Sequence, residues 1–151
     1  MIKVGDVFEI KTAIGHAYFQ FVKKIPPMGS LIRVLPGTYS EPIDDLSDLI
    51  QMKTNFWIFF PIAAAVKNGV VRKVERYDVP PHSKETPIFR TGLVNPESKR
   101  VDVWWFWDGE KEWKVGTITE KQRELPIRGT WNDTMLIERI EKGWRPENDY
   151  R

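Results

Sequence analysis

The chain contains no cysteine, and this absence excludes several kinds of chemistry. Without a thiol, its 151 residues form no disulfide, hold no cysteine nucleophile and offer no cysteine ligand to a metal. A chain without cysteine also fits a reducing compartment. The first residues, Met1 to Asp6, lack the basic and apolar regions of a secretory signal. We therefore expect a cytoplasmic protein.

Histidine is scarce as well, since only His16 and His82 are present. Neither lies in a HExxH or HxH pattern, so the sequence predicts no metal site and no cofactor. The patterns typical of serine nucleophiles and phosphate loops, GxSxG, GxxxxGK[ST] and GxGxxG, do not occur. Together these absences favour a protein without enzymatic activity.

Long hydrophobic runs and a strong net charge are also missing. The longest apolar run, 56–66, is interrupted by Pro61 and is shorter than the roughly 20 residues that span a bilayer, so no membrane partner is expected. The 23 Lys and Arg nearly balance the 21 Asp and Glu, which gives no general reason to bind nucleic acid. With 41% hydrophobic and 29% charged residues, the composition is that of a folded protein, and we expect a single domain over 1–151.

Alternation of polar and apolar residues predicts a three-stranded antiparallel meander over 4–11, 16–23 and 30–35. The segment 55–60 is apolar on both faces, which predicts a buried strand in the centre of the sheet. A further strand is predicted over 70–77. We expect a mainly antiparallel, strongly curved sheet that resembles an SH3-like partial barrel.

Two or three short helices complete the predicted α+β fold. Asp44 or Asp45 can cap a helix that contains Leu46, Leu49 and Ile50, and Pro61 can begin a second helix at 62–67. Asn132 is a suitable N-cap for a third helix that ends at Gly143. The segment 78–100 contains four prolines, which predicts a long irregular loop, and 147–151 is expected to be a flexible tail.

The most informative segment is 101–113, which holds four of the seven tryptophans in a predicted β-hairpin around Asp108-Gly109. A two-residue loop would pair Trp104 with Trp113, whereas a four-residue loop would pair Phe106 with Trp113. Both registers place one apolar set on the same face of the hairpin: Trp104, Phe106, Trp113 and Val115. The opposite face is partly polar: it carries Val101, Val103, Trp105 and Trp107 from the first strand, and Glu112 and Lys114 from the second.

The partly polar face indicates that Trp105 and Trp107 are the more exposed rings and that they bind a partner. Glu112 and Lys114 would border this surface. The 78–100 loop adds His82 and Arg90 as candidate contacts, because long loops often carry binding residues. The alternative is structural: tryptophans commonly close the core of a small domain, and the loop would then only wrap around it.

Three segments resemble a bacterial immunity-protein family of polymorphic toxin systems, immunity protein twenty-six, whose description also covers a small phosphotriesterase. The residues that carry the resemblance are Gly5-Asp6-Val7-Phe8-Glu9-Ile10, Ala17-Tyr18-Phe19-Gln20-Phe21 and Trp131-Asn132-Asp133-Thr134 with Leu136-Ile137-Glu138-Arg139-Ile140. The resemblance implies that the protein neutralises a cognate toxin by protein–protein association. A homo-oligomer is compatible with this role.

Two other functions remain open. One is a small hydrolase that acts on phosphoesters through a carboxylate pair, either Asp44 with Asp48 or Glu110 with Glu112. The other is a single-stranded nucleic-acid-binding module, in which exposed tryptophans stack on bases beside the basic middle of the chain.

Overall fold

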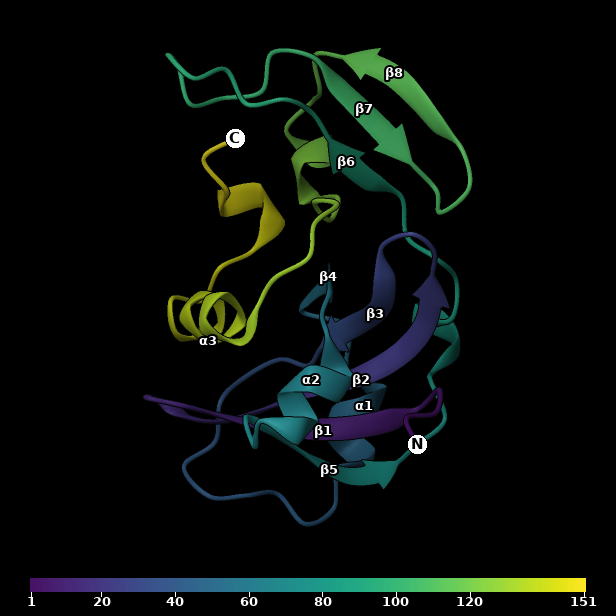
Figure 1. The fold of residues 1–151 in the computed structure, drawn as a ribbon, viewed down its shortest axis with the longest axis vertical. Helices are drawn as coiled ribbons and strands as arrows, with labels where there is room; N and C mark the ends of the chain where they lie inside the picture. Colours follow the sequence, from purple (N-terminus) through teal and green to yellow (C-terminus); the bar gives the residue numbers. More distant parts are fainter. The chain divides into compact units, whose positions relative to one another are not determined.

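The computed structural model describes residues 1–151 and has an α+β fold with two mostly antiparallel sheets and three α-helices (Figure 1). The chain divides into two compact units. Unit 1 comprises Met1–Glu85 and Gly129–Gly143, and unit 2 comprises Thr86–Arg128 and Trp144–Arg151. No helix has the length and apolar character needed to cross a membrane.

Unit 1 is built on a five-stranded sheet in the order β4-β3-β2-β1-β5. Its strands are β1 (Asp6–Thr12), β2 (Gly15–Ile25), β3 (Gly29–Val34), β4 (Phe56–Phe59) and β5 (Val71–Arg76). The first three strands form the predicted antiparallel meander, with Phe8 opposite Phe19 and Phe19 opposite Val34. The order is open at both ends, so this sheet is not closed into a barrel.

The prediction that the apolar segment 55–60 forms a central strand is wrong, because β4 is the end strand of its sheet. Its side chains are nevertheless largely buried. One edge of β4 pairs with β3, and the other meets the segment before α3 (Asp133–Glu141) through a parallel bridge between Phe59 and Thr130. The remote segment covers the edge, which explains why an end strand has no polar face.

The helices of unit 1 begin close to the predicted positions, but neither Asp44 nor Asp45 is the N-cap of the first helix; the N-cap is Leu46, which makes no side-chain cap bond. In α1 (Ser47–Gln51), Leu49 and Ile50 join a buried cluster with Val7, Tyr18, Leu35 and Leu46. The helix α2 (Ile62–Lys67) follows Pro61. The predicted cap of α3 is confirmed, since Asn132 Oδ1 accepts a hydrogen bond from Met135 N at 2.8 Å.

A buried arginine, Arg33, links the meander to the loop after α1. Its guanidinium donates to Gln20 Oε1 at 2.7 Å, to Thr54 Oγ1 at 2.8 Å and to the carbonyl oxygens of Ile50 and Met52. Burial lowers the pKa of Arg33 to about 10. The side chain therefore remains charged at neutral pH and satisfies backbone acceptors that the short helix leaves free.

Unit 2 contains a three-stranded antiparallel sheet in the order β6-β7-β8, formed by β6 (Phe89–Thr91), β7 (Trp104–Trp107) and β8 (Glu112–Gly116). The 78–100 segment, predicted to be an irregular loop, contains two short regular elements. They are the strand β6 and, within unit 1, the 3₁₀ turn η1 (Pro81–Ser83). Two further turns, η2 (Lys121–Glu124) and η3 (Pro146–Asn148), complete the elements of unit 2.

The C-terminal residues 147–151, expected as a flexible tail, pack into unit 2. Asp149 is 5% exposed, and its carboxylate accepts from Trp144 Nε1 at 3.2 Å and from Arg151 Nε at 2.8 Å. Its carbonyl oxygen accepts from Arg123 at 2.8 Å. Burial raises the pKa of Asp149, but the bonds from Arg151 and Trp144 outweigh burial and lower it below its usual value.

Candidate partner-binding groove

The tryptophan hairpin adopts the four-residue-loop register, with Phe106 opposite Trp113 and Trp105 opposite Lys114. Asp108 explains this choice, because its Oδ1 accepts from Glu110 N at 2.9 Å and from Lys111 N at 2.7 Å. Gly109 has a φ of 102°, which a residue with a side chain rarely adopts. The carboxylate and the glycine together determine the loop length and hence the faces of the strands.

One tryptophan is exposed on each face of the hairpin. Trp105 is 37% exposed on β7, and Trp113 is 40% exposed on β8. The other two tryptophans of β7, Trp104 and Trp107, are buried. The sequence therefore identified the faces of the strands, but it did not identify which ring on each face is covered.

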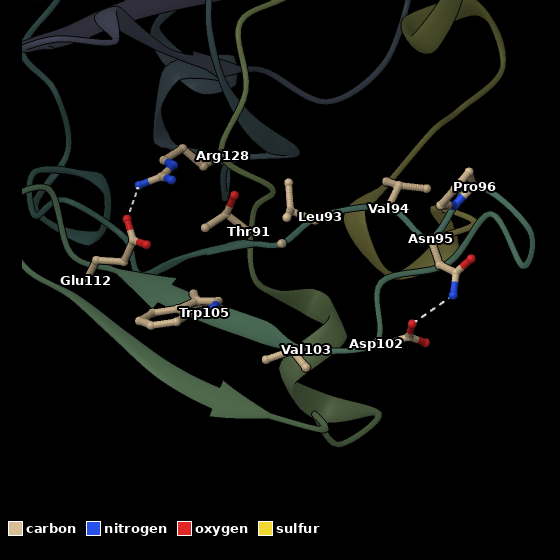
Figure 2. A pocket seen from close by; sticks show the side chains of 11 residues that line it. Thr91, Leu93, Val94, Asn95, Pro96, Asp102, Val103, Trp105, Glu112 and Arg128 are labelled. Carbon is tan, nitrogen blue, oxygen red and sulfur yellow. Dashed lines mark hydrogen bonds and ion pairs between the residues drawn. The ribbon is translucent and has the colours of Figure 1, made fainter.

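Trp105 lies in an open groove of about 680 Å³ within unit 2, which we call the Trp105 groove. Its apolar lining consists of Trp105, Leu93, Val94 and Val103, and Figure 2 shows these side chains together with the polar ones. Leu93 is 92% exposed, and both valines are exposed as well. The volume is within the range of about 300–1,000 Å³ that is usual for small-molecule pockets, but the groove is open and does not enclose a ligand.

A glycine makes this arrangement possible. A Cβ atom at Gly92 would collide with the Val101 side chain and would lie 2.8 Å from the carbonyl oxygen of Val103. Only glycine allows the segment that follows β6 to approach so closely. This approach brings Leu93 and Val94 beside Val103 and β7.

The two ends of the groove are polar. At one end Arg128 Nη1 forms an ion pair with Glu112 Oε2 at 2.9 Å, and the Arg128 guanidinium lies 5.2 Å from the centre of the Trp107 ring. At the other end Asn95 Nδ2 donates to Asp102 Oδ2 at 3.0 Å, as Figure 2 shows. An apolar floor between polar ends is the usual composition of a protein-binding surface.

The structure brings some of the predicted contact residues together at this groove. Trp105 and Glu112 line it, and exposed Lys114 is the residue opposite Trp105. Trp107 is only 6% exposed and packs against Phe89 with ring centres 5.5 Å apart. It therefore supports the hairpin, and so little of its ring reaches the surface that it cannot act as an anchor for a partner.

Arg90, another predicted contact, is fully buried. Its guanidinium donates to the carbonyl oxygens of Pro146, Arg123 and Leu125 at 2.7, 3.2 and 3.3 Å, and it lies 4.5 Å from the centre of the Trp104 ring. Burial and the neighbouring Arg123 lower the pKa of Arg90 to about 10. Arg90 thus connects β6 to η2 and η3, much as Arg33 connects the elements of unit 1.

The predicted contact His82 belongs to unit 1, whereas the groove lies in unit 2. Its Nδ1 lies 2.8 Å from Ser83 Oγ, and its Nε2 lies 3.0 Å from the carbonyl oxygen of Gln51. Both ring nitrogens are engaged within unit 1, which gives His82 a local structural role.

Sequence reasoning placed Val103 on the face of Trp105 but did not single out Leu93, Val94, Asn95 or Asp102 as groove residues. Leu93 and Val94 form an apolar pair within a segment rich in proline and charge, between Gly92 and Asn95-Pro96. An apolar pair beside a glycine, in a predicted surface loop, is a signal for an exposed hydrophobic site that could have been used.

The carboxylate pairs considered for catalysis do not share a pocket with a proton-transfer partner. Asp44 and Asp48 are both exposed. Glu110 lies in the exposed hairpin turn, while Glu112 is paired with Arg128. No group of three or more His, Asp or Glu side chains is arranged to hold a metal ion.

No protein-family model, no curated protein and no solved structure matches the chain.

Proposed function

We propose that the protein is a non-enzymatic immunity protein that neutralises a cognate bacterial toxin in the cytoplasm by binding it at the Trp105 groove. One observation carries this proposal: four apolar side chains, Leu93, Val94, Val103 and Trp105, are exposed together along one groove. The resemblance to an immunity-protein family supports a toxin as the class of partner. The SH3-like curvature of the large sheet stays a prediction and is not needed for this role.

The exposed apolar cluster supports a protein as the ligand. Soluble monomers seldom leave large contiguous apolar patches in water, and the patches that they do expose are often binding sites. Leu93 is 92% exposed, so its apolar surface is removed from water only when a partner covers it, and this burial is favourable. The groove is open, which suits side chains of a protein surface better than a small molecule that needs enclosure.

Trp105 is the expected anchor of the interface. Its ring is 37% exposed and is already held in place by the pairing of β7 with both neighbouring strands. A rigid tryptophan loses little conformational freedom on binding, and such residues dominate many interfaces. The Glu112–Arg128 pair and the Asn95–Asp102 pair lie at the ends of the groove, where they can exclude water and orient the toxin.

Inhibition by association requires no bond to form or break at the groove. The charged groups at its Arg128 end neutralise each other at 2.9 Å, which favours a role in recognition over one in proton transfer. The expected toxin surface is an apolar projection that fills the groove and is flanked by polar groups able to reach Glu112 and Arg128.

The test is co-expression with a candidate toxin from a reading frame next to the gene for this chain, followed by calorimetry of the purified pair. We expect protection of the host cell and a stable complex. Trp105→Ala should weaken binding by about 2 kcal/mol, or roughly thirtyfold. Trp113→Ala is the matched control, because Trp113 is equally exposed at 40% on the opposite face of the same hairpin.

A second variant, Leu93→Asp, places a charge at the most exposed apolar position without changing the buried core. It should abolish protection while the thermal unfolding temperature remains that of the wild type. The proposal fails if the wild-type chain neither protects nor binds. It also fails if Trp105→Ala and Leu93→Asp both bind like the wild type.

A further inference from the structure

The three-stranded sheet of unit 2 has one covered edge and one open edge. On the β6 side, Arg90 N donates to the carbonyl oxygen of Pro126 at 2.8 Å, and Arg128 N donates to the carbonyl oxygen of Arg90 at 3.0 Å. On the other side β8 is the last strand, and no backbone segment pairs with it (Figure 1). An unpaired strand is a template for strand addition by another chain.

The hydrogen-bond pattern shows which groups this open edge presents. Because the N–H and C=O of Arg90 point away from β7, the Arg90–Phe106 pair is a non-hydrogen-bonded pair. The backbone groups of Phe106 therefore point to β8 and bond with Trp113. Alternation along β8 then directs the N–H and C=O groups of Glu112 and Lys114 outward, away from the sheet.

Irregularities at both ends limit the open edge to three residues. The tight loop closes at Lys111, whose carbonyl oxygen accepts from Asp108 N at 3.1 Å. At the other end Trp105 is opposite Lys114 but Trp104 is opposite Gly116, so Val115 is an extra residue that bulges out of β8. The regular edge is Glu112-Trp113-Lys114, and its centre is Trp113.

This three-residue edge is complementary to itself. We propose that β8 pairs antiparallel with β8 of a second copy of this chain about a twofold axis at Trp113. In that register Glu112 of each copy lies opposite Lys114 of the other copy, and the outward N–H and C=O groups of the two residues meet as hydrogen-bonded pairs. Trp113 lies opposite Trp113, which brings together two rings that are each 40% exposed in the single chain.

Charge excludes the neighbouring registers. Because only Glu112 and Lys114 direct their N–H and C=O groups outward, the second strand can shift only by two residues. A shift in one direction places Glu112 opposite Glu112, and a shift in the other direction places Lys114 opposite Lys114. Like charges directly opposite each other are unfavourable, so only the register centred on Trp113 is retained. A twofold interface of this kind is closed, so it stops at a dimer.

The dimer can form without a bound toxin, because it uses the backbone edge of β8, whereas the apolar lining of the groove is Leu93, Val94, Val103 and Trp105. Glu112 belongs to both sites, since it also lines the groove and forms an ion pair with Arg128. The twofold axis is perpendicular to the combined six-stranded sheet, so the Trp105 faces of both copies lie on the same side. The short edge predicts a weak dimer whose population rises with protein concentration.

Sedimentation equilibrium of the full chain from micromolar to millimolar concentration tests the proposal. The wild type should dimerise. Lys114→Glu and Glu112→Lys should each raise the dissociation constant by roughly tenfold to hundredfold, since two attractive pairs become repulsive in each case. A mixture of the two variants should dimerise again, because every pair in the mixed dimer has opposite charges. Lys121→Glu changes the net charge by the same amount as Lys114→Glu, but on an exposed turn, and should leave the dimer unchanged.

A second measurement uses the absence of cysteine in the natural chain. The Cα atoms of a non-hydrogen-bonded pair lie about 4.5 Å apart, which is within disulfide range. With a mild oxidant, Trp113→Cys should form a covalent dimer faster than Lys121→Cys. A monomeric wild type, a dimer insensitive to Lys114→Glu, a mixture that stays monomeric, or equal crosslinking of the two cysteine variants would each overturn the proposal.

Discussion

Replacement of Arg33 by methionine tests how unit 1 is held together. Arg33 is fully buried on β3 and donates hydrogen bonds to Gln20 Oε1, Thr54 Oγ1, Ile50 O and Met52 O, at distances of 2.7 to 3.2 Å. Methionine is also long, unbranched and flexible, so it fills much of the same space. The Arg33→Met variant therefore removes the donors while it preserves most of the packing.

The expected loss follows from the acceptors that remain. Thr54 Oγ1 keeps a bond to Ser83 Oγ at 2.8 Å, but Gln20 Oε1 and the carbonyl oxygens of Ile50 and Met52 lose the donor that Arg33 supplied. A buried acceptor without a donor costs about 1–3 kcal/mol. Relaxation of the loop after α1 and added apolar contact offset part of this cost. We expect the free energy of unfolding to fall by about 3–5 kcal/mol.

Urea denaturation followed by circular dichroism measures this change. Tryptophan fluorescence reports less on unit 1, because only Trp57 and Trp131 lie in it. The control is Arg72→Met on β5, since the Arg72 side chain is 63% exposed and its ion pair with Glu9 at 3.3 Å should contribute at most about 1 kcal/mol. If Arg33→Met unfolds within about 1 kcal/mol of the wild type, the buried network does not stabilise unit 1 as we reason.

Two further predictions concern unit 1. Burial raises the pKa of Asp6, but hydrogen bonds from Lys3 N, Arg76 and Lys73 outweigh burial and lower the pKa below 3.8. The ionised carboxylate therefore stabilises the fold above pH 3.8, and this contribution is lost as the pH falls through the folded-state pKa. Asp6→Asn should therefore lower the unfolding temperature at neutral pH, and the difference from wild type should shrink in acid; a constant difference would contradict the linkage. Asn132→Ala removes the bond to Met135 N and should lower stability by about 1 kcal/mol in urea denaturation, whereas Asn132→Asp, which retains an acceptor, should stay close to wild type.

Local patterns predicted the elements whose partners are close in sequence. The meander follows from alternation around Phe8 and Phe19 and from short connections, so each strand meets the next one along the chain. The cap at Asn132 and the loop at Asp108-Gly109 depend on hydrogen bonds across two or three residues. Such contacts are encoded within a few residues, and a single sequence is enough to recognise them.

Contacts between distant segments could not be predicted in the same way. Arg33 occupies a strand position that alternation assigns to the face of Leu31, and nothing nearby indicates that Gln20, Ile50 and Met52 will surround it. β4 is apolar because Thr130, more than seventy residues away, covers its edge. Arg90 is basic and lies in a proline-rich segment, which resembles a surface loop, yet its acceptors come from residues near 123 and 146.

The open parts of unit 2 have a common origin in the composition of β8. Glu112 and Lys114 keep one face of this strand polar, so that face is not sealed by the core and Trp105 beside it remains accessible. The same two side chains carry opposite charges at a spacing of two, which makes the outer edge complementary to a second copy. Trp107 is buried because it packs against Phe89 and lies near Arg128, neither of which the hairpin sequence contains. Alternation therefore assigns side chains to faces, whereas contacts from other segments decide which face stays available for a partner.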